Sequence, residues 1–414
     1  MLVKRAFTLL LLAVLCFALL NCGGTTGSSD NSGGNNSGGN GGGSSSTSEY
    51  VYAVNGSSLV GYKVSSGGML EPIANLQSSN QLRYQYLSAS PDGRFLYSFQ
   101  NPCIGSGNCG IGVNFNQDNQ VLVQSVASDG TLDAPKGVVN GDQLPIDVKI
   151  SPNGKYAFVL SGATLNKVTV YAVNSDGTFG ASTGSVQLPQ PNVSDIEGGR
   201  AYPMLGGFTG GNILWVGEII SYRSGSEPSL ISIRFDPDTG AVVDHKVKDL
   251  ITISEVESLA TTSNKVITAE GMAWSFIKPN TTTVWDANNG DPQLQKTCTL
   301  SNDANCGRNV QMTGSLAKPF VFAINYPENV GDFRIVGFRV GDDGSLTSSA
   351  GTQTFASGSF SDLDVDTAAK FLFVTNRDSK TLTVMSIDQS SAAVSVTGTA
   401  TTSDAVGAVA SVIR

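Results

Sequence analysis

Two copies of one short stretch decide how this chain folds. They are Ser90-Pro-Asp-Gly-Arg-Phe-Leu-Tyr-Ser98 and Ser151-Pro-Asn-Gly-Lys-Tyr-Ala-Phe-Val159. In each copy Pro presets φ, the next two residues tolerate a tight turn, and an apolar strand follows, which is typical of a β-hairpin. Weaker copies recur every ~50–60 residues, a period typical of repeat folds. They occupy residues 211–217, 264–269, 318–323 and 370–376.

A second turn, rich in Asp, Asn and Gly, falls later in each repeat. Its seven copies occupy residues 64–70, 127–132, 173–179, 235–241, 285–290, 340–346 and 387–391. The first turn has only six copies, because the chain opens with a lone strand at 50–54 and ends with another at 406–414. We predict that these two ends pair and close a ring. The predicted fold class is all-β, a seven-bladed β-propeller of four-stranded blades over residues 49–414.

The repeat resembles that of lactonase-like and YVTN-type seven-bladed propellers. The closest match is Phe373-Val-Thr-Asn376 followed by Leu382-Thr-Val-Met-Ser-Ile-Asp388, and the resemblance covers residues 49–414. It implies the fold and leaves the activity open, because propellers include hydrolases, redox enzymes and plain binding modules.

Composition narrows the class of partner. The formal net charge is −9 and only 14% of residues are charged. Phosphate backbones are bound by clustered Lys and Arg, so nucleic acid is not an expected partner. The expected state is a monomer.

The N-terminus predicts export. Lys4 and Arg5 precede an apolar run at 6–20 that is short for a membrane span, so residues 1–21 are expected to be a signal peptide. Leu19-Leu20-Asn21-Cys22 resembles a bacterial lipobox, which implies acylation of Cys22. Gly23 in place of Asp then implies an outer-membrane or cell-surface location. The alternative is an ordinary signal peptide with an incidental cysteine.

Residues 22–48 are expected to be a tether. After Cys22 they are Gly, Ser, Asn and Thr with Asp30 as the only charge, so they cannot bury apolar surface. A Gly-rich coil of this length reaches roughly 25–30 Å.

Four further cysteines form two local pairs, Cys103/Cys109 and Cys298/Cys306. Their even number, close spacing and predicted exported setting favour two disulfides. A zinc site is the alternative, although neither pair has a CxxC spacing or a nearby histidine.

Carboxylates gather at the expected start of several innermost strands, near the mouth of the central channel. They are Asp147, Glu255, Glu257, Asp362, Asp364 and Asp366. Such acids could bind Ca²⁺ or act as an acid/base pair. The structural alternative is that they accept hydrogen bonds from backbone amides in turns and between blades.

The only histidine, His245, is expected on an outer strand, away from the face that usually binds ligands. This argues against Ser-His-Asp and multi-histidine metal sites, and it leaves empty the histidine role that a phosphogluconolactonase resemblance implies. Arg83 is a candidate site residue together with Asp147, Glu255 and Asp362, and three other arginines are also expected near loops of the ligand face. These are Arg200, Arg223 and Arg308.

Aromatic residues are also expected near that face, where they could stack on sugars or peptides or simply pack between blades. They are Tyr84, Tyr86, Tyr202, Trp274 and Tyr326.

Two functions fit these observations. The first is a non-catalytic, lipid-anchored envelope module that binds a protein or polysaccharide. The alternative is a lactonase-like hydrolase of the phosphogluconolactonase type that uses acids such as Asp147, Glu255 and Asp362 with an arginine, either alone or with the assistance of Ca²⁺. No other cofactor is expected.

Overall fold

The structure is a computed structural model of the 414-residue chain, and its folded unit spans Thr47–Arg414. It describes residues 47–76, 84–100, 121–139, 145–161, 165–189, 202–219, 229–250, 256–270, 281–299, 303–306, 309–325, 333–355 and 360–414. The predicted signal peptide and most of the tether lie outside the described residues. No helix in the described part of the chain has the length and apolar character needed to cross a membrane.

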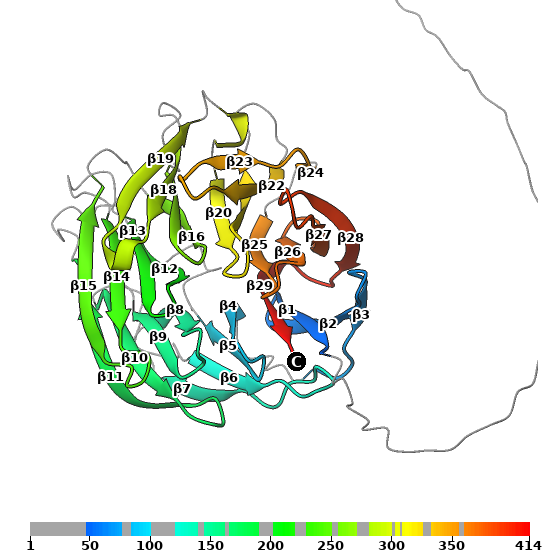
Figure 1. Ribbon diagram of the computed structural model, residues 1–414. Coiled ribbons are helices and arrows are strands. Elements are labelled where there is room, and N and C mark those ends of the chain that lie inside the picture. Colours follow the sequence, from blue (N-terminus) through cyan, green and yellow to red (C-terminus); the bar gives the residue numbers. More distant parts are fainter. Residues whose placement is uncertain are drawn as a thin grey trace, which may run out of the picture. The chain divides into compact units, whose positions relative to one another are not determined.

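Seven antiparallel sheets surround a central axis, so the protein is a seven-bladed β-propeller (Figure 1). Strands are given from the axis outward. Blade 1 contains β4 (Tyr84–Ala89), β5 (Phe95–Gln100), β6 (Val121–Ser125) and β7 (Lys136–Val139). Blade 2 contains β8 (Pro145–Ile150), β9 (Tyr156–Ser161), β10 (Lys167–Val173) and β11 (Phe179–Gln187). Blade 3 contains β12 (Tyr202–Thr209), β13 (Ile213–Ile219), β14 (Ser229–Phe235) and β15 (Val242–Asp249).

The remaining blades follow the same plan. Blade 4 contains β16 (Val256–Thr261), β17 (Lys265–Glu270), β18 (Thr281–Asp286) and β19 (Gln293–Thr299), with the 3₁₀ turn η3 (Asn288–Gly290). Blade 5 follows η4 (Ala304–Cys306) and contains β20 (Asn309–Gly314), β21 (Phe320–Asn325), β22 (Phe333–Val340) and β23 (Leu346–Ser348), while the extra strand β24 (Gln353–Phe355) also pairs with β22. Blade 6 contains β25 (Phe360–Val365), β26 (Phe371–Asn376), β27 (Thr381–Ile387) and β28 (Val394–Thr401).

Blade 7 confirms the predicted closure of the ring. It contains β29 (Val406–Ile413), β1 (Glu49–Asn55), β2 (Ser58–Val64) and β3 (Leu70–Pro72). Glu49 pairs with Ile413, and Ser48 and Arg414 exchange two backbone hydrogen bonds of 2.7 Å. The two ends of the folded unit therefore lie side by side in one sheet.

The core consists of seven apolar clusters, one between each pair of neighbouring blades. Because a second strand faces a neighbouring blade on both sides, β9, β21 and β26 are buried at every residue. This explains why the repeats show continuous apolar runs here rather than strict alternation. The outermost strand β15 is mostly exposed instead.

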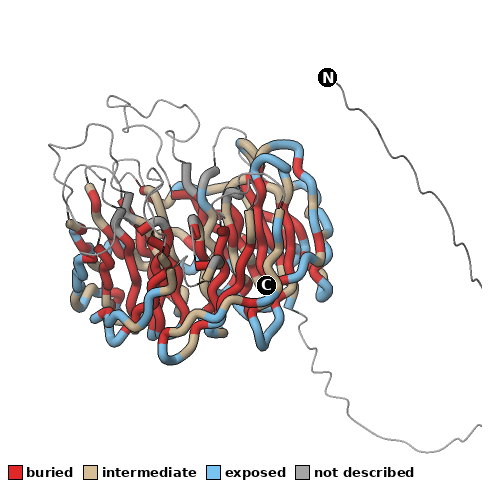
Figure 2. The backbone as a smooth tube through the Cα atoms, turned by 90° about the horizontal axis from the view of Figure 1, so that it is seen from above, coloured by how far each residue is buried: buried red, intermediate tan, exposed pale blue. Residues whose placement is uncertain are grey.

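The turns of the two repeated motifs lie on one side of the ring, hereafter the turn face; the opposite side is the loop face. Exposed turns follow one rim of the molecule in Figure 2. Gly130 shows why the second turn carries glycine: its φ is +84°, and an added Cβ would lie 2.5 Å from the Tyr50 ring. The turn of one blade thus packs directly on its neighbour.

Candidate functional site

The innermost strands of all seven blades enclose a channel along the axis. Its volume is about 1040 Å³, and its lining includes residues of β4, β8, β12, β16, β20, β25 and β29. A cavity of this size can hold a small sugar-like ligand. It is therefore the candidate site.

A bulge shapes the channel wall. In five innermost strands the register shifts between the first and third residues. The third residues line the channel and form the bulge ring, which consists of Tyr86, Asp147, Ser258, Gln311 and Asp362. The residues two positions later also line the channel and form the second ring, which consists of Ser88, Lys149, Ala260, Thr313 and Asp364.

Asp147 and Asp362, both predicted as candidates, use their carboxylates to join blades. The Leu205 N–H of blade 3 donates to Asp147 Oδ2 at 3.2 Å, and the Val409 N–H of blade 7 donates to Asp362 Oδ2 at 3.0 Å. An innermost strand exposes backbone amides that no neighbouring strand pairs with. These carboxylates accept hydrogen bonds from such amides on the innermost strand of the next blade. The expected hydrogen bonds between blades are therefore present.

Both carboxylates retain some capacity to accept further hydrogen bonds. Asp147 Oδ1 accepts the Val148 N–H at 2.8 Å, so two contacts use about half of its acceptor positions. Asp362 Oδ1 accepts the Leu363 N–H at 2.9 Å and also the Gln311 amide. About one acceptor position of Asp362 remains for a water or ligand.

Both acids are half-buried: they face the channel, and protein packs against the rest of each side chain. Burial raises the pKa of Asp362 to about 7, against the opposing effect of the Val409 and Leu363 amides. Burial also raises the pKa of Asp147, with the Lys149 charge opposing the rise. A carboxyl group with a pKa near neutrality can take up or release a proton at physiological pH.

Acids continue along β25 toward the turn face. Asp364 Oδ2 accepts the Ser411 N–H at 2.7 Å and its hydroxyl at 2.8 Å, while Asp366 accepts the amides of the turn that follows. Burial and the charge of Asp366 raise the pKa of Glu49, the first residue of β1, to about 8. These groups gather where the two chain ends close the ring.

The channel contains several residues that the sequence reasoning missed, and three of them bear on its chemistry. They are Lys149 and Gln311 in the wall and Arg377, which lies in the turn after β26 and also lines the channel. Lys149 alternates with Asp147 along β8, so the alternation was the signal that could have revealed it.

Several predicted residues lie outside the described part of the chain. These are Glu255, Arg83, Arg200, Arg223, Arg308, Trp274, Tyr326, Cys22, Cys103 and Cys109. Tyr84 and Tyr202 begin β4 and β12, and Glu257 lies in β16, but their side chains are not described. Tyr86 is 42% exposed on the channel wall.

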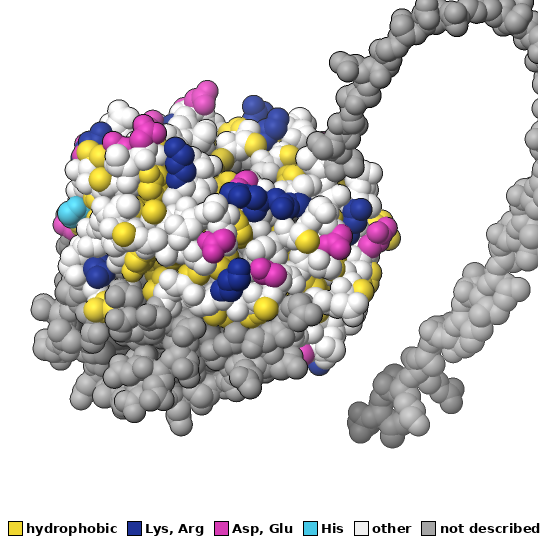
Figure 3. Space-filling model, turned by 90° about the horizontal axis from the view of Figure 1, so that it is seen from below, with side chains coloured by type: hydrophobic (Ala, Val, Ile, Leu, Met, Phe, Trp, Pro, Cys, Tyr) yellow, Lys and Arg dark blue, Asp and Glu magenta, His cyan; other side chains and the backbone are white. Residues whose placement is uncertain are grey.

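His245 lies on the outermost strand of blade 3, where it pairs with Ile233 and is exposed. It is thus remote from the channel, as predicted. The side of the molecule in Figure 3 carries interspersed acidic and basic side chains rather than a patch of one sign.

The predicted Cys298–Cys306 disulfide is confirmed, with a Cα–Cα distance of 5.7 Å. Asp303 lies beside it, but the two sulfurs are joined to each other, so the structure gives no support to the zinc alternative. The bond links β19 to η4, the connection between blades 4 and 5.

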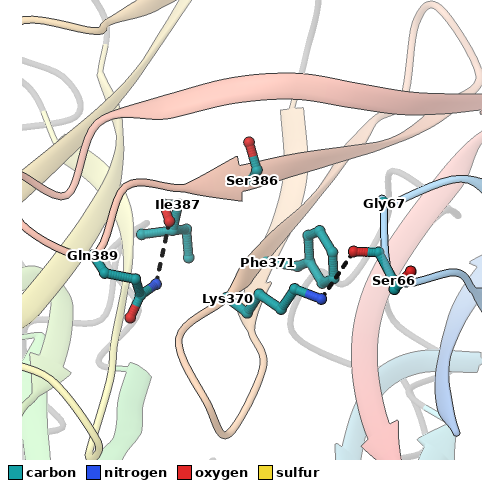
Figure 4. Close-up of a pocket in the computed structure, with 7 residues that line it drawn as sticks. All are labelled: Ser66, Gly67, Lys370, Phe371, Ser386, Ile387 and Gln389. Carbon is teal, nitrogen blue, oxygen red and sulfur yellow. Dashed lines mark hydrogen bonds between the residues drawn. The ribbon is translucent and has the colours of Figure 1, made fainter.

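A second cavity of about 530 Å³ lies on the turn face between blades 6 and 7 (Figure 4). Lys370 crosses it and donates to the Ser66 carbonyl at 2.9 Å. Tyr50 makes the equivalent contact to Ser128 O at the next boundary, at 2.6 Å. At this boundary the Lys370 ammonium group thus makes the contact that a tyrosine hydroxyl makes at the next one. The residues around this cavity therefore form a contact between blades.

Comparisons with known proteins identify the fold. No family model and no curated protein matches the sequence. A Bacteroides fragilis protein provisionally assigned as a 6-phosphogluconolactonase is 14% identical with a TM-score of 0.63, over 89% of this chain and 99% of that one. The Pseudomonas aeruginosa periplasmic gluconolactonase is 16% identical with a TM-score of 0.59, over 89% and 99% of the two chains. A Lactobacillus plantarum protein is 14% identical with a TM-score of 0.60, over 88% and 99%.

The chain therefore has the fold of the lactonase-like seven-bladed propellers. This confirms the resemblance drawn from the repeats as far as the fold is concerned.

Proposed function

We propose that the protein is an exported, lactonase-like hydrolase that opens sugar-derived lactones in its central channel. The observation that carries the proposal is that Asp147, Asp362 and Lys149 line one cavity large enough for such a substrate. The fold shared with a periplasmic gluconolactonase supports the same class of substrate.

Ring opening needs a base, a stabilised oxyanion and a returned proton. In the proposed reaction a carboxylate, Asp147 or Asp362, takes a proton from water as the water oxygen attacks the lactone carbonyl carbon. The ring C–O bond then breaks, and the carboxylic acid returns the proton to the ring oxygen. The product is a hydroxy acid, and no cofactor is consumed.

The test measures hydrolysis of glucono-1,5-lactone by the purified full chain. The release of acid is recorded at about pH 6.5, where the proposed base is partly ionised. Asp147→Asn and Asp362→Asn are compared with Asp238→Asn, whose side chain is exposed on the turn face at 88%. We expect one channel variant to lose about 10²-fold or more in kcat/KM and the control to keep wild-type activity. Equal activity in all four proteins would rule out a carboxylate mechanism in the channel.

A second candidate is a non-catalytic envelope module that binds a protein or polysaccharide. It is favoured by the contacts of Asp147 and Asp362 with the next blade, which give both carboxylates a structural role. Absence of lactone hydrolysis, together with retention of an envelope polysaccharide or protein on the immobilised chain, would select this function.

We also propose that Cys22 is acylated and anchors the chain at the outer membrane or cell surface. Mass spectrometry of the mature N-terminus tests this directly. A diacylglyceryl-modified Cys22 supports the anchor, whereas cleavage at another residue rejects it.

A further inference from the structure

Lys149 is one of two cations that line the channel, and Arg377 is the other. Lys149 lies in the second ring, two residues after Asp147 on β8, so both side chains lie on the same side of the strand. Asp362 and Asp364 line the same cavity from blade 6. Lys149 and Arg377 therefore share the channel with four carboxyl groups, those of Asp147, Asp362, Asp364 and Asp366.

Among the described residues, no carboxylate forms an ion pair with Lys149. Within the described ranges its side chain forms no ion pair or hydrogen bond, in contrast to Lys265, which is bound to Asp286 at 3.0 Å. Its charge opposes the burial that raises the pKa of Asp147, Asp362 and Asp364. The ammonium is thus available to a ligand while it favours ionisation of the surrounding acids.

This balance of charge suits some ligands and disfavours others. A lactone is neutral, and attack by water places one negative charge on its carbonyl oxygen, which a single ammonium group can stabilise. A phosphorylated sugar brings about two more negative charges into a channel that already contains four carboxyl groups against two cations. Repulsion would then oppose binding.

We propose that Lys149 binds the oxygen of the lactone carbonyl as its negative charge develops, and that the surrounding carboxylates restrict the channel to uncharged lactones and reject phosphorylated ones. This inference rests on the proposed function. It assigns Lys149 to the oxyanion and the acids to proton transfer.

The experiment measures binding apart from turnover, because the product carboxylate mimics the oxyanion. Isothermal titration of the full chain compares gluconate with 6-phosphogluconate. The proteins are wild type, Lys149→Met, Lys149→Arg, and Lys155→Met as an exposed turn-face control. Asp364→Asn tests the repulsion.

For the wild type, we expect gluconate to bind at least about tenfold more tightly than 6-phosphogluconate. Lys149→Met should weaken gluconate binding about tenfold or more, Lys149→Arg should restore part of it, and Lys155→Met should change nothing. Asp364→Asn should narrow the gap between the two ligands.

Three results would overturn the inference: equal or tighter binding of 6-phosphogluconate, unchanged gluconate binding by Lys149→Met, or no binding of either acid. If gluconate binding depends on Lys149 but no lactone is opened, the selection by charge holds and the hydrolase proposal alone fails.

Discussion

At the scale of single residues, contacts between blades depend on turn glycines. Gly130 has a φ of +84°, and its carbonyl accepts the Tyr52 hydroxyl at 2.6 Å. Gly154 has a similar φ of +73° but faces open space, because nothing lies within 4 Å of its would-be Cβ. Alanine substitutions at the two positions can therefore separate the cost of backbone strain from the cost of disturbed packing between blades.

We predict that Gly130→Ala lowers the free energy of unfolding by about 2–4 kcal/mol, because the new Cβ meets the Tyr50 ring and the φ is unfavourable. Gly154→Ala should cost only about 1 kcal/mol, from backbone strain alone. Chemical denaturation of both variants measures the difference. Equal losses of unfolding free energy in the two variants would show that the turn at Gly130 does not pack against the neighbouring blade.

At the scale of elements, the connection between blades 4 and 5 is held by the Cys298–Cys306 disulfide and by hydrogen bonds. The Thr282 hydroxyl donates to the Cys306 carbonyl at 3.4 Å, and the Asn309 amide donates to the Thr282 hydroxyl at 2.8 Å. Asn309 begins β20, two residues before Gln311 in the bulge ring. The disulfide therefore lies next to the start of a channel strand.

Replacing both Cys298 and Cys306 by Ser should lower the free energy of unfolding by about 2–3 kcal/mol, the loop entropy expected for a short disulfide loop. The double variant is preferable to a reductant because it leaves Cys103 and Cys109 unchanged. Denaturant unfolding of both proteins under oxidising conditions provides the measurement. A stability equal to wild type would mean that the hydrogen bonds alone hold the connection.

At the scale of the whole molecule, the dependence of stability on pH follows from the difference between the protons bound by the folded protein and by the unfolded chain. Burial raises the pKa of Glu49 to about 8 and of Asp362 to about 7, so the folded protein holds protons that the unfolded chain releases. Hydrogen bonds within turns lower the pKa of exposed turn-face acids such as Asp129 and Asp176. The two groups of acids therefore shift stability in opposite directions.

We predict greatest stability at about pH 4, where the unfolded chain begins to release the protons that Glu49 and Asp362 keep in the folded protein. Above about pH 4 the free energy of unfolding should fall, by roughly 1–2 kcal/mol up to about pH 8, because the folded protein keeps protons that the unfolded chain has already released. Below about pH 4 it should fall again, because the unfolded chain binds more protons at the turn acids. Urea unfolding across these pH values tests both arms. Glu49→Gln should flatten the upper arm, and a steady rise in stability up to pH 8 would contradict the assignment.

The amino-acid sequence was enough to predict the repeat, the number of blades and the pairing of the chain ends, and it favoured the Cys298–Cys306 bond over a zinc site. Each depends on short-range chemistry or on counting: Pro-Asp-Gly turns at 90–98, apolar second strands and cysteines eight residues apart. The position of His245 away from the channel was also predicted from the sequence, and it is the single histidine of the chain.

The full set of side chains that share the channel could not be predicted from the sequence, because they come together only in the closed ring. Asp147 and Lys149 belong to blade 2 and Asp362 to blade 6, more than 200 residues later, so no local pattern relates them. The bulge that places these residues on the channel wall arises from the pairing of the first two strands within each blade. The Leu205 and Val409 amides, in contrast, are bound across blade boundaries. Ring closure brings these distant positions together, and burial by the whole ring raises the pKa values of their carboxyl groups.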